Sequence, residues 1–186
     1  MKIKIETPLT EKTALSLNAG DTVLISGTIY TARDAAHKNL IELIQLEKPL
    51  PIELKDQIIY YVGPAPAKPG EIIGSAGPTT SSRMDAYTPA LLEKTGLRGM
   101  IGKGYRSKSV FEAIEQHKAV YFAAIGGAGA LLASCIKSCE VVAYPELGSE
   151  AIHKLEVENF PVLVTIDCRG RDMYKAGRES YLNSLK

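Results

Sequence analysis

From Asp21 onward the sequence alternates short runs of β-branched and apolar residues with segments whose apolar residues recur at helical spacing. We expect strands over four of the apolar runs, at 21–30, 58–62, 99–102 and 119–125. We expect helices over four of the amphipathic segments, at 32–47, 84–95, 107–117 and 130–136. Helices that alternate with strands cover the faces of a sheet, so the pattern predicts an α/β domain with a mixed, partly parallel sheet.

The regions outside this alternation also carry strand signals. Further strands are expected at 1–6, 71–76, 139–144, 151–158 and 161–166. Residues 151–158 fit either an edge strand or a short helix, and we favour the strand because of Leu155, Val157 and the alternating charges. Five prolines stand between Pro49 and Pro69, and they favour strands and loops over helix in that stretch.

Length and composition narrow the class of protein. The 186 residues suit a single domain over 1–186, which is long enough to bury a sizeable core. A net charge of +1 leaves no basic excess to neutralise a phosphate backbone, which argues against a nucleic-acid partner. No apolar run reaches the roughly 18 residues of a membrane-spanning helix, and Met1–Glu6 has no secretory apolar core. We therefore expect a cytoplasmic protein without a membrane partner.

The three cysteines do not form a recognisable framework. Cys135, Cys139 and Cys168 are too few and too odd in number for a disulfide scaffold. Three cysteines can hold an iron–sulfur cluster with one open iron, but the usual cluster spacings are absent here. Cys135 also lies in an apolar run, where a free cysteine behaves as a small hydrophobe. We favour the reading that they are buried thiols, and we predict no metal ligands on this chain.

Two segments place an arginine beside hydroxyls and a carboxylate where a strand gives way to a helix. In Gly77–Asp85, four hydroxyl side chains precede Arg83, and in Thr31–His37, Arg33 stands next to Asp34. A guanidinium matches a carboxylate through two parallel hydrogen bonds, and the N-terminus of a helix also favours an anion. Two such arginines suggest a substrate with more than one carboxylate. The structural alternatives are a plain helix cap and a solvated helix face.

The predicted helix 32–47 begins shortly after two threonines and carries an arginine and a histidine in its first turns. Thr28 or Thr31 is expected to cap it. On this helix Arg33 and His37 stand four residues apart and so share a face.

Three other segments carry glycines or charges. Lys103 lies between two glycines after a strand, where the backbone can approach a ligand and the lysine offers a point charge; the alternative is a tight turn. The glycines at 126–130 lack the third glycine of a dinucleotide fingerprint, because Leu132 stands there, and we attribute them to close packing of a helix on the sheet. Residues 167–172 are interpreted as a structural ion-pair cluster.

Taken together, these motifs resemble the β region of class I fumarases and L-tartrate dehydratases, which are iron–sulfur hydro-lyases. The resemblance rests on four segments and covers about residues 20–174 in order: Thr31–His37, Tyr61–Pro64, Gly77–Asp85 and Gly102–Gly104. It implies a swivelling β/β/α domain. It also implies a [4Fe–4S] cluster held by three cysteines of an α region, which here would be a separate α subunit in a heterodimer or heterotetramer.

The resemblance also implies roles for individual residues. Arg33, Arg83 and Lys103 match the cations that bind the substrate carboxylates, and Thr79 matches the proposed catalytic base. Asp34 and His37 are expected to orient Arg33. Asp85 is likewise expected to lie behind the groups that touch the substrate.

The implied activity is the reversible hydration of fumarate to L-malate, a tricarboxylic acid cycle reaction, which would require the α subunit. One alternative is dehydration of L-tartrate to oxaloacetate by the same architecture. Another is a non-catalytic anion-binding module. Without an α subunit, the chain is expected to cover its apolar interface by self-association.

Overall fold

The computed structural model describes residues 2–185 and contains one seven-stranded mixed sheet in the order β1-β2-β3-β4-β5-β7-β6. The strands are β1 (Lys2–Glu6), β2 (Thr22–Thr31), β3 (Ile58–Tyr60), β4 (Gly99–Gly102), β5 (Val120–Ala123), β6 (Ile136–Ala143) and β7 (Ile152–Ile166). The helices are α1 (Glu11–Ser16), α2 (Asp34–Gln45), α3 (Thr88–Thr95), α4 (Lys108–Gln116), α5 (Gly129–Ser134) and α6 (Met173–Ser184). Two 3₁₀ segments, η1 (Ser81–Met84) and η2 (Pro145–Glu150), complete the fold.

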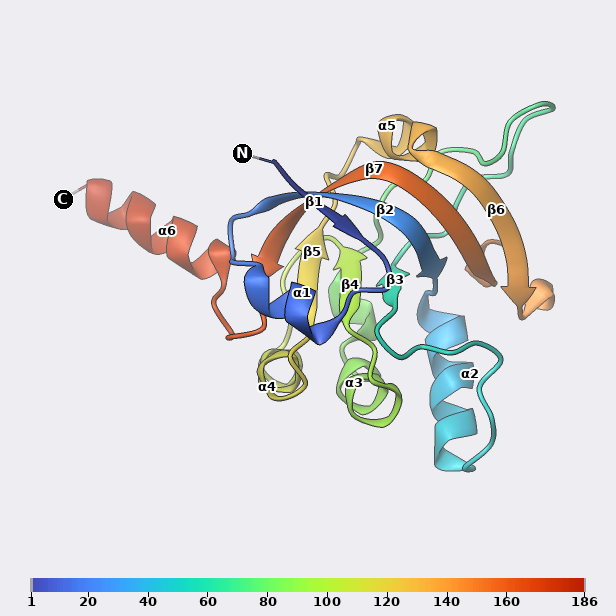
Figure 1. Cartoon of the computed structure of the whole chain (residues 1–186), viewed down its shortest axis with the longest axis horizontal. Helices are drawn as coiled ribbons and strands as arrows, with labels where there is room; N and C mark the ends of the chain where they lie inside the picture. Colours follow the sequence, from blue (N-terminus) through green and yellow to red (C-terminus); the bar gives the residue numbers. More distant parts are fainter. Residues whose placement is uncertain (1, 186) are drawn as a thin grey trace.

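The sheet closes on itself. Strands β2, β3, β4 and β5 run parallel, and β7 pairs antiparallel with both β5 and β2. In Figure 1 the long strands β2 and β7 curve over the short strands β3, β4 and β5, and helices α2, α3 and α4 lie on the other side. The expected mixed α/β architecture is confirmed.

Alternation along the strands creates two cores, one on each side of the sheet. Ile58 and Tyr60 of β3 point into the space enclosed by the sheet, where they meet apolar residues of β2 and β7 such as Ile29 and Phe160. Tyr61, just after β3, belongs to the second core, between the sheet and the helices. Successive side chains of a strand point to opposite faces of the sheet, so a strand covered on both faces contributes alternate residues to two different cores.

The structure corrects two of the expected strands. Residues 71–76 form a loop, because Ala65 and Gly74 close a local turn: the Gly74 N–H donates to the Ala65 carbonyl at 3.1 Å. The segments 151–158 and 161–166 are one strand, β7, which continues through Pro161. Nor is 151–158 an edge, because β7 lies between β5 and β6. Pro161 is tolerated close to a bulge between Ile25 and Gly27 of β2.

Helix boundaries shift as well. The helix expected at 84–95 begins only at Thr88, with Pro89 in its first turn, and the short segment η1 precedes it. The helix expected at 130–136 ends at Ser134, and β6 starts at Ile136. The expected helices 32–47 and 107–117 correspond to α2 and α4 with slightly shorter bounds.

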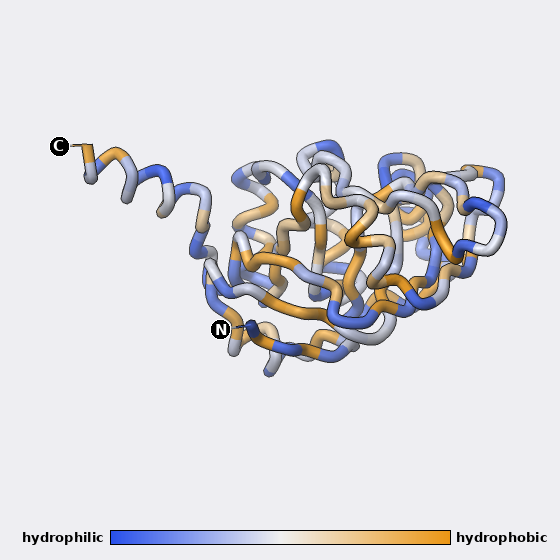
Figure 2. Tube along the Cα trace, turned by 90° about the horizontal axis from the view of Figure 1, so that it is seen from above, coloured by the Kyte–Doolittle hydropathy of each residue, from blue (hydrophilic) through white to orange (hydrophobic). Residues whose placement is uncertain are grey.

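The C-terminal helix α6 has no buried residues and extends away from the rest of the molecule (Figures 1 and 2). Figure 2 also shows the most hydrophobic stretches concentrated within the body of the molecule. Among residues 2–185 no helix combines the length and apolarity needed to cross a membrane.

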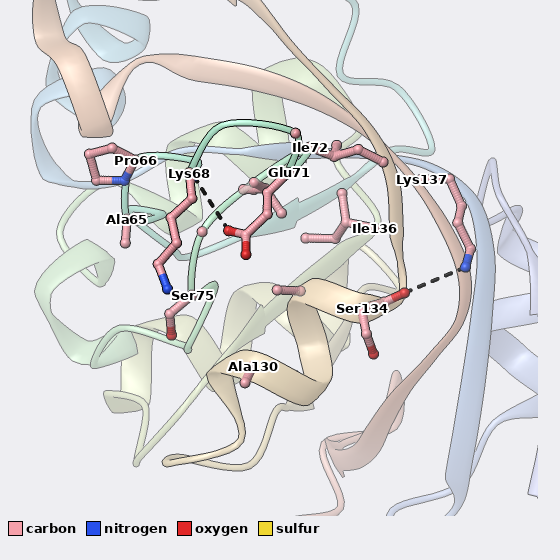
Figure 3. Close-up of a pocket in the computed structure, with 14 residues that line it drawn as sticks. Ala65, Pro66, Lys68, Glu71, Ile72, Ser75, Ala130, Ser134, Ile136 and Lys137 are labelled. Atoms are coloured by element: carbon pink, nitrogen blue, oxygen red, sulfur yellow. Dashed lines mark hydrogen bonds between the residues drawn. The ribbon is translucent and has the colours of Figure 1, made fainter.

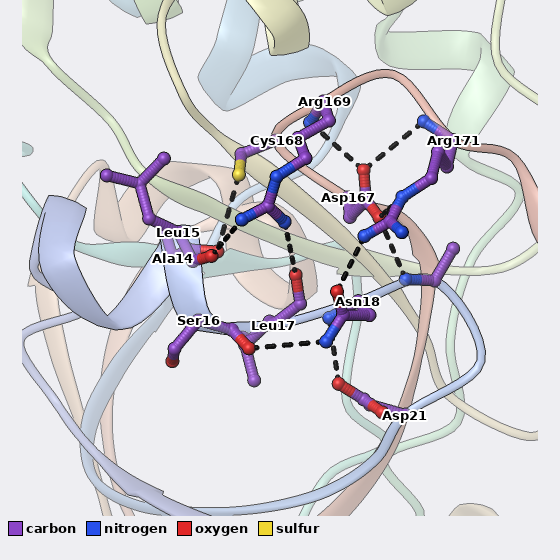
Figure 4. A network of polar contacts seen from close by, with 11 residues as sticks. Ala14, Leu15, Ser16, Leu17, Asn18, Asp21, Asp167, Cys168, Arg169 and Arg171 are labelled. Carbon is purple, nitrogen blue, oxygen red and sulfur yellow. Dashed lines mark hydrogen bonds and ion pairs between the residues drawn. The ribbon is translucent and has the colours of Figure 1, made fainter.

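Asp167 anchors the turn after β7 (Figure 4). Its buried carboxylate accepts hydrogen bonds from the backbone N–H groups of Ala19, Arg169 and Arg171, and Arg171 Nε donates to it at 2.6 Å. This confirms the ion-pair cluster expected at 167–172. Burial alone would raise the pKa of Asp167, but these backbone and guanidinium donors outweigh it and lower the pKa below its usual value.

His37 lies in the first turn of α2 and points into the second core. The ring is fully buried and lies 5.4 Å from the Tyr61 ring and 6.0 Å from the Tyr87 ring, between centroids. Its Nδ1 donates to the Arg33 carbonyl at 2.8 Å, and Nε2 has no partner in the part of the chain that the structure describes. Burial lowers the pKa of His37 to about 4 because the site disfavours the charged ring.

We predict that Asp167→Asn lowers the free energy of unfolding by about 2 kcal/mol at pH 7, because it removes a charged acceptor from a buried set of donors. A group whose folded pKa is depressed stabilises the fold above its unfolded pKa, and that contribution is lost as the pH falls through the folded pKa. Urea titrations at pH 7 and pH 3 should therefore show the difference from wild type shrinking in acid. Glu179→Gln on α6 is the control, and equal stability of both variants at pH 7 would contradict the role of Asp167.

A second stability prediction concerns His37. Its unfolded form takes up a proton near pH 6.5 and its folded form only near pH 4. The unfolded state thus binds more protons in between, and about 3 kcal/mol of stability should be lost as the pH falls from 6.5 to 4. Urea unfolding of His37→Asn should lack this component of the pH dependence, while His117→Asn should retain it. Parallel stability curves for wild type and His37→Asn would refute the buried neutral ring.

Candidate active site

The expected site residues gather at one edge of the sheet. Because β2, β3, β4 and β5 are parallel, the segments that follow them leave at the same edge. Arg33 follows β2, Lys103 follows β4, and the segment containing Thr79 returns to this edge from the long loop after β3. The Thr79 N–H donates to the Tyr61 carbonyl at 2.7 Å, and the Lys103 N–H donates to the Thr79 carbonyl at 3.3 Å.

The two arginines belong to a chain of alternating charges. Arg83 Nε donates to Asp34 Oδ1 at 2.9 Å. The other carboxylate oxygen, Oδ2, lies 3.9 Å from Arg33 Nη2, and the same nitrogen lies 3.4 Å from Glu150 Oε1. The order Glu150–Arg33–Asp34–Arg83 therefore fixes one guanidinium relative to the other. The Arg83 side chain is 51% exposed and the Arg33 side chain 19%, so both remain accessible.

Glycines make room for these side chains. A Cβ on Gly63 would lie 2.5 Å from Arg33 Nη1 and 3.2 Å from its Cδ, so only glycine lets the arginine pass. A Cβ on Gly102 would collide with Ser81 Oγ and lie 2.9 Å from Tyr61. Gly102 therefore serves the packing of Ser81 against β4.

A buried tyrosine joins the two loops that carry Thr79 and Lys103. The Tyr121 hydroxyl lies 2.9 Å from both Ser81 Oγ and the Gly104 carbonyl, and the Ser81 N–H donates to the Lys103 carbonyl at 2.9 Å. Burial raises the pKa of Tyr121, so its hydroxyl stays protonated and available as a donor. Tyr121, which is buried, thus fixes the two loops relative to each other.

Asp85 does not reach the arginines of the site. Its carboxylate accepts from Arg106 Nε at 2.7 Å and from the Ser107 N–H at 2.6 Å. Arg106 is buried, donates to Thr88 Oγ1 at 2.8 Å and lies over the Tyr121 ring at 4.9 Å. This buried pair, which sequence reasoning missed, holds η1 against the start of α4. A single arginine after Gly104 gives no signal of burial in the sequence.

The start of α2 differs from the expectation. Arg33 occupies the N-cap position without a side-chain cap. Thr31 is engaged elsewhere: its hydroxyl donates to the Ala151 carbonyl at 3.2 Å. The N–H of Ala35 instead donates to Glu150 Oε2 at 3.1 Å. Neither Thr28 nor Thr31 caps this helix, and a distant glutamate takes that position.

Of the remaining expectations, Asp34 contacts Arg83 more closely than Arg33, and His37 contacts the carbonyl of Arg33 and not its guanidinium. Of the glycines at 126–130, Gly129 packs against a loop and not against the sheet, whereas a Cβ on Gly127 would meet nothing within 4 Å. The Gly129 carbonyl accepts from Ala76 at 3.1 Å, and a Cβ on Gly129 would lie 3.1 Å from the Gly77 nitrogen. Close approach is the reason for a glycine there, as expected, but its partner is the Gly77 segment.

The cysteines do not fit an iron–sulfur cluster. All three are free thiols; Cys168 is buried and donates to the Ala14 carbonyl, whereas Cys135 lies against the Leu131 carbonyl. Within residues 2–185 no three His, Cys, Asp or Glu side chains come together as a metal site.

A cavity of about 740 Å³ opens between the long loop after β3 and helix α5 (Figure 3). None of the expected site residues lines it. Its wall combines apolar side chains with a few polar ones: Ile72, Ile73, Ala130, Ala133, Ile136, Lys68, Glu71, Ser134 and Lys137. Ile72 is 51% exposed, and Leu131 on α5 and Ile125 after β5 are 59% and 75% exposed. Gly126, the neighbour of Ile125, lies close to an expected site residue, since a Cβ on it would be 3.8 Å from Lys103 Cδ.

Comparison with known proteins agrees with this arrangement. The family model described as "Fumarase C-terminus" matches residues 1–177. The anaerobic class I fumarate hydratase of Escherichia coli is 47% identical over 152 residues, which are 81% of this chain and 28% of that protein. Fumarate hydratase 2 of Leishmania major is 43% identical over 83% of this chain and 28% of its own length.

A protein of more similar length also matches. The putative L(+)-tartrate dehydratase subunit beta of Methanocaldococcus jannaschii is 40% identical over 172 residues, covering 90% of this chain and 88% of that protein. By contrast, the chain spans less than a third of the fumarate hydratases named above. The matched span includes the strands β2 to β5 and every residue of the charged chain, and the chain belongs to the fumarase C-terminus family.

Proposed function

We propose that this chain is the β subunit of a two-subunit hydro-lyase that interconverts fumarate and L-malate. The observation that carries the proposal is the pair of arginines, Arg33 and Arg83, linked through one carboxylate at the same sheet edge as Thr79 and Lys103. The similarity to class I fumarate hydratases supports it.

The charges of the site suit a dicarboxylate. Arg33 and Arg83 contact two carboxylates, Asp34 and Glu150, and Lys103 adds a third cation at the same edge, which leaves one positive charge in excess. Arg83 contacts Asp34 through Nε, so its two terminal nitrogens can form the fork that binds a substrate carboxylate. The other arginine, at a distance set by Asp34, would hold the second carboxylate. Fixed cations would also stabilise negative charge that develops when a C–H proton leaves.

Thr79 is proposed as the group that removes this proton. Its backbone is fixed on both sides, to Tyr61 and to Lys103, which places its side chain at a defined position on the edge. A threonine hydroxyl has too high a pKa to act as a base unless another group activates it. We place that activating group in the partner subunit.

The partner is proposed to be a cluster-bearing α subunit. The fumarate hydratases that match are more than three times as long as the aligned region, so most of such a protein lies outside this chain. The [4Fe–4S] cluster implied by the family would be held by that part. The exposed apolar side chains of Ile72, Ile125 and Leu131 form the proposed docking surface. Free thiols are consistent with a reducing, cytoplasmic location.

L-Tartrate dehydration is the second candidate. The Methanocaldococcus jannaschii protein with that name matches nearly full length against this chain. L-Tartrate differs from L-malate by one hydroxyl, and the same cations would serve both dicarboxylates. A non-catalytic anion-binding module is the third candidate, and the absence of an α-subunit gene beside this one would favour it.

The decisive experiment is anaerobic co-expression with an α-type protein encoded in the same genome, followed by assays of fumarate, L-malate and L-tartrate turnover. We expect the complex to turn over fumarate and L-malate, and the purified chain alone to be folded, colourless and inactive. Turnover of L-tartrate alone would assign the second candidate. No turnover by a complex with an intact cluster would remove the proposed activity.

The role of Thr79 can be tested in the same complex. We expect Thr79→Ala to slow exchange of the substrate C–H proton with solvent at least 100-fold, since general-base catalysis typically contributes 10²–10⁴-fold. Exchange is followed by NMR in deuterium oxide. Thr80→Ala, one residue away and exposed, is the control. Exchange that persists in Thr79→Ala would exclude Thr79 as the base.

A further inference from the structure

Glu150 is the one carboxylate in the charged chain that comes from a distant part of the sequence. It ends η2, the segment that connects β6 to β7, and it is more than 110 residues from its partners on α2. Its two oxygens have different tasks. Oε1 lies 3.4 Å from Arg33 Nη2, and Oε2 accepts the Ala35 N–H at 3.1 Å.

The backbone that carries Glu150 is fixed to the end of β2. The Thr31 hydroxyl donates to the Ala151 carbonyl at 3.2 Å and accepts the His153 N–H at 2.9 Å. The Ala151 N–H closes a turn onto the Gly148 carbonyl at 3.0 Å. Because Ala151, the next residue in the chain, is held through both its carbonyl and its N–H, the carboxylate reaches Arg33 from a fixed support.

Arg33 is held more closely by Glu150 than by Asp34, its neighbour in the sequence. Its distance to Asp34 is 3.9 Å, and Asp34 is already engaged by Arg83 at 2.9 Å. Arg33 Nε has no hydrogen-bond partner among residues 2–185, and Gly63 leaves space along one side of the guanidinium. Glu150 therefore provides its closest ionic contact.

We propose that Glu150 is a positioning residue that fixes the guanidinium of Arg33 for one carboxylate of the substrate. The inference rests on the proposed function, and it adds a residue to which that proposal assigns no part. The carboxylate uses one oxygen to cap the first turn of α2 and the other to orient Arg33, so the helix start and the substrate-binding cation move as one unit. Its negative charge also keeps Arg33 from leaving the site toward solvent.

Two substitutions separate these tasks. Glu150→Gln keeps a carbonyl oxygen that can accept the Ala35 N–H but loses the ionic contact with Arg33. Glu150→Ala loses both. Glu146→Gln, exposed on the same segment, is the matched control.

The first readout needs no activity. ¹⁵N relaxation of the Arg33 Nε–H group in the chain alone should show an ordered side chain in wild type and Glu146→Gln, and a mobile one in Glu150→Gln. The melting temperature of Glu150→Gln should stay close to wild type, while that of Glu150→Ala should fall. An Arg33 side chain equally ordered in wild type and Glu150→Gln would overturn the proposal.

The second readout uses the complex with the α subunit. Glu150→Gln should raise the KM for L-malate about tenfold with kcat little changed, because a carboxylate contact made in both ground and transition states affects binding uniformly. An unchanged KM would also overturn the proposal and reduce Glu150 to a helix cap. If the wild-type complex turns over no dicarboxylate, the proposed function fails, and the relaxation of Arg33 still decides whether Glu150 positions it.

Discussion

The rest of the structure depends on the pairing of β7 with both β2 and β5. This strand of 15 residues closes the sheet, because it pairs with the long strand β2 and also with β5, the last of the short parallel strands. Closure gives β3, β4 and β5 two covered faces and forces their side chains into two separate cores. It also holds the carboxyl ends of the parallel strands at one edge, and it brings the turn between β6 and β7 to the start of α2. The position of β7 therefore determines that Glu150, which directly precedes this strand, lies next to Arg33.

Local patterns were sufficient to predict much of the fold. The strand at β2, the helix at α2 and the α4 helix follow from β-branched runs and helical spacing within one segment. The errors lie where distant contacts override local signals. Residues 71–76 look like a strand, but no neighbouring strand is available to them, and they turn back onto Ala65. Pro161 suggests a break, but the bulge in β2 accommodates it.

The candidate site shows the same division between local and distant information. The arginines, Lys103 and Thr79 could be proposed as site residues because hydroxyls, glycines and charges cluster in short motifs, and the motifs match a family. Arg106 and Glu150 could not be found, because neither is marked by its neighbours in the sequence. Each matters only through a partner brought close by the fold: Asp85 for Arg106, and Arg33 for Glu150. Supporting residues are therefore the part of a site that single-sequence reasoning is least able to reach.

The exposure of the charged chain explains why such a site would be divided between two subunits. Arg83 is half exposed, and an ion pair in contact with water contributes little, since solvent and salt screen it. The same guanidinium binds a carboxylate more strongly when a covering surface excludes water and lowers the effective dielectric constant. The exposed apolar residues Ile125 and Leu131 provide a surface against which such a cover can pack. On the proposed division, this chain would hold the cations in position, and docking of the proposed partner would strengthen their contact with the substrate carboxylates.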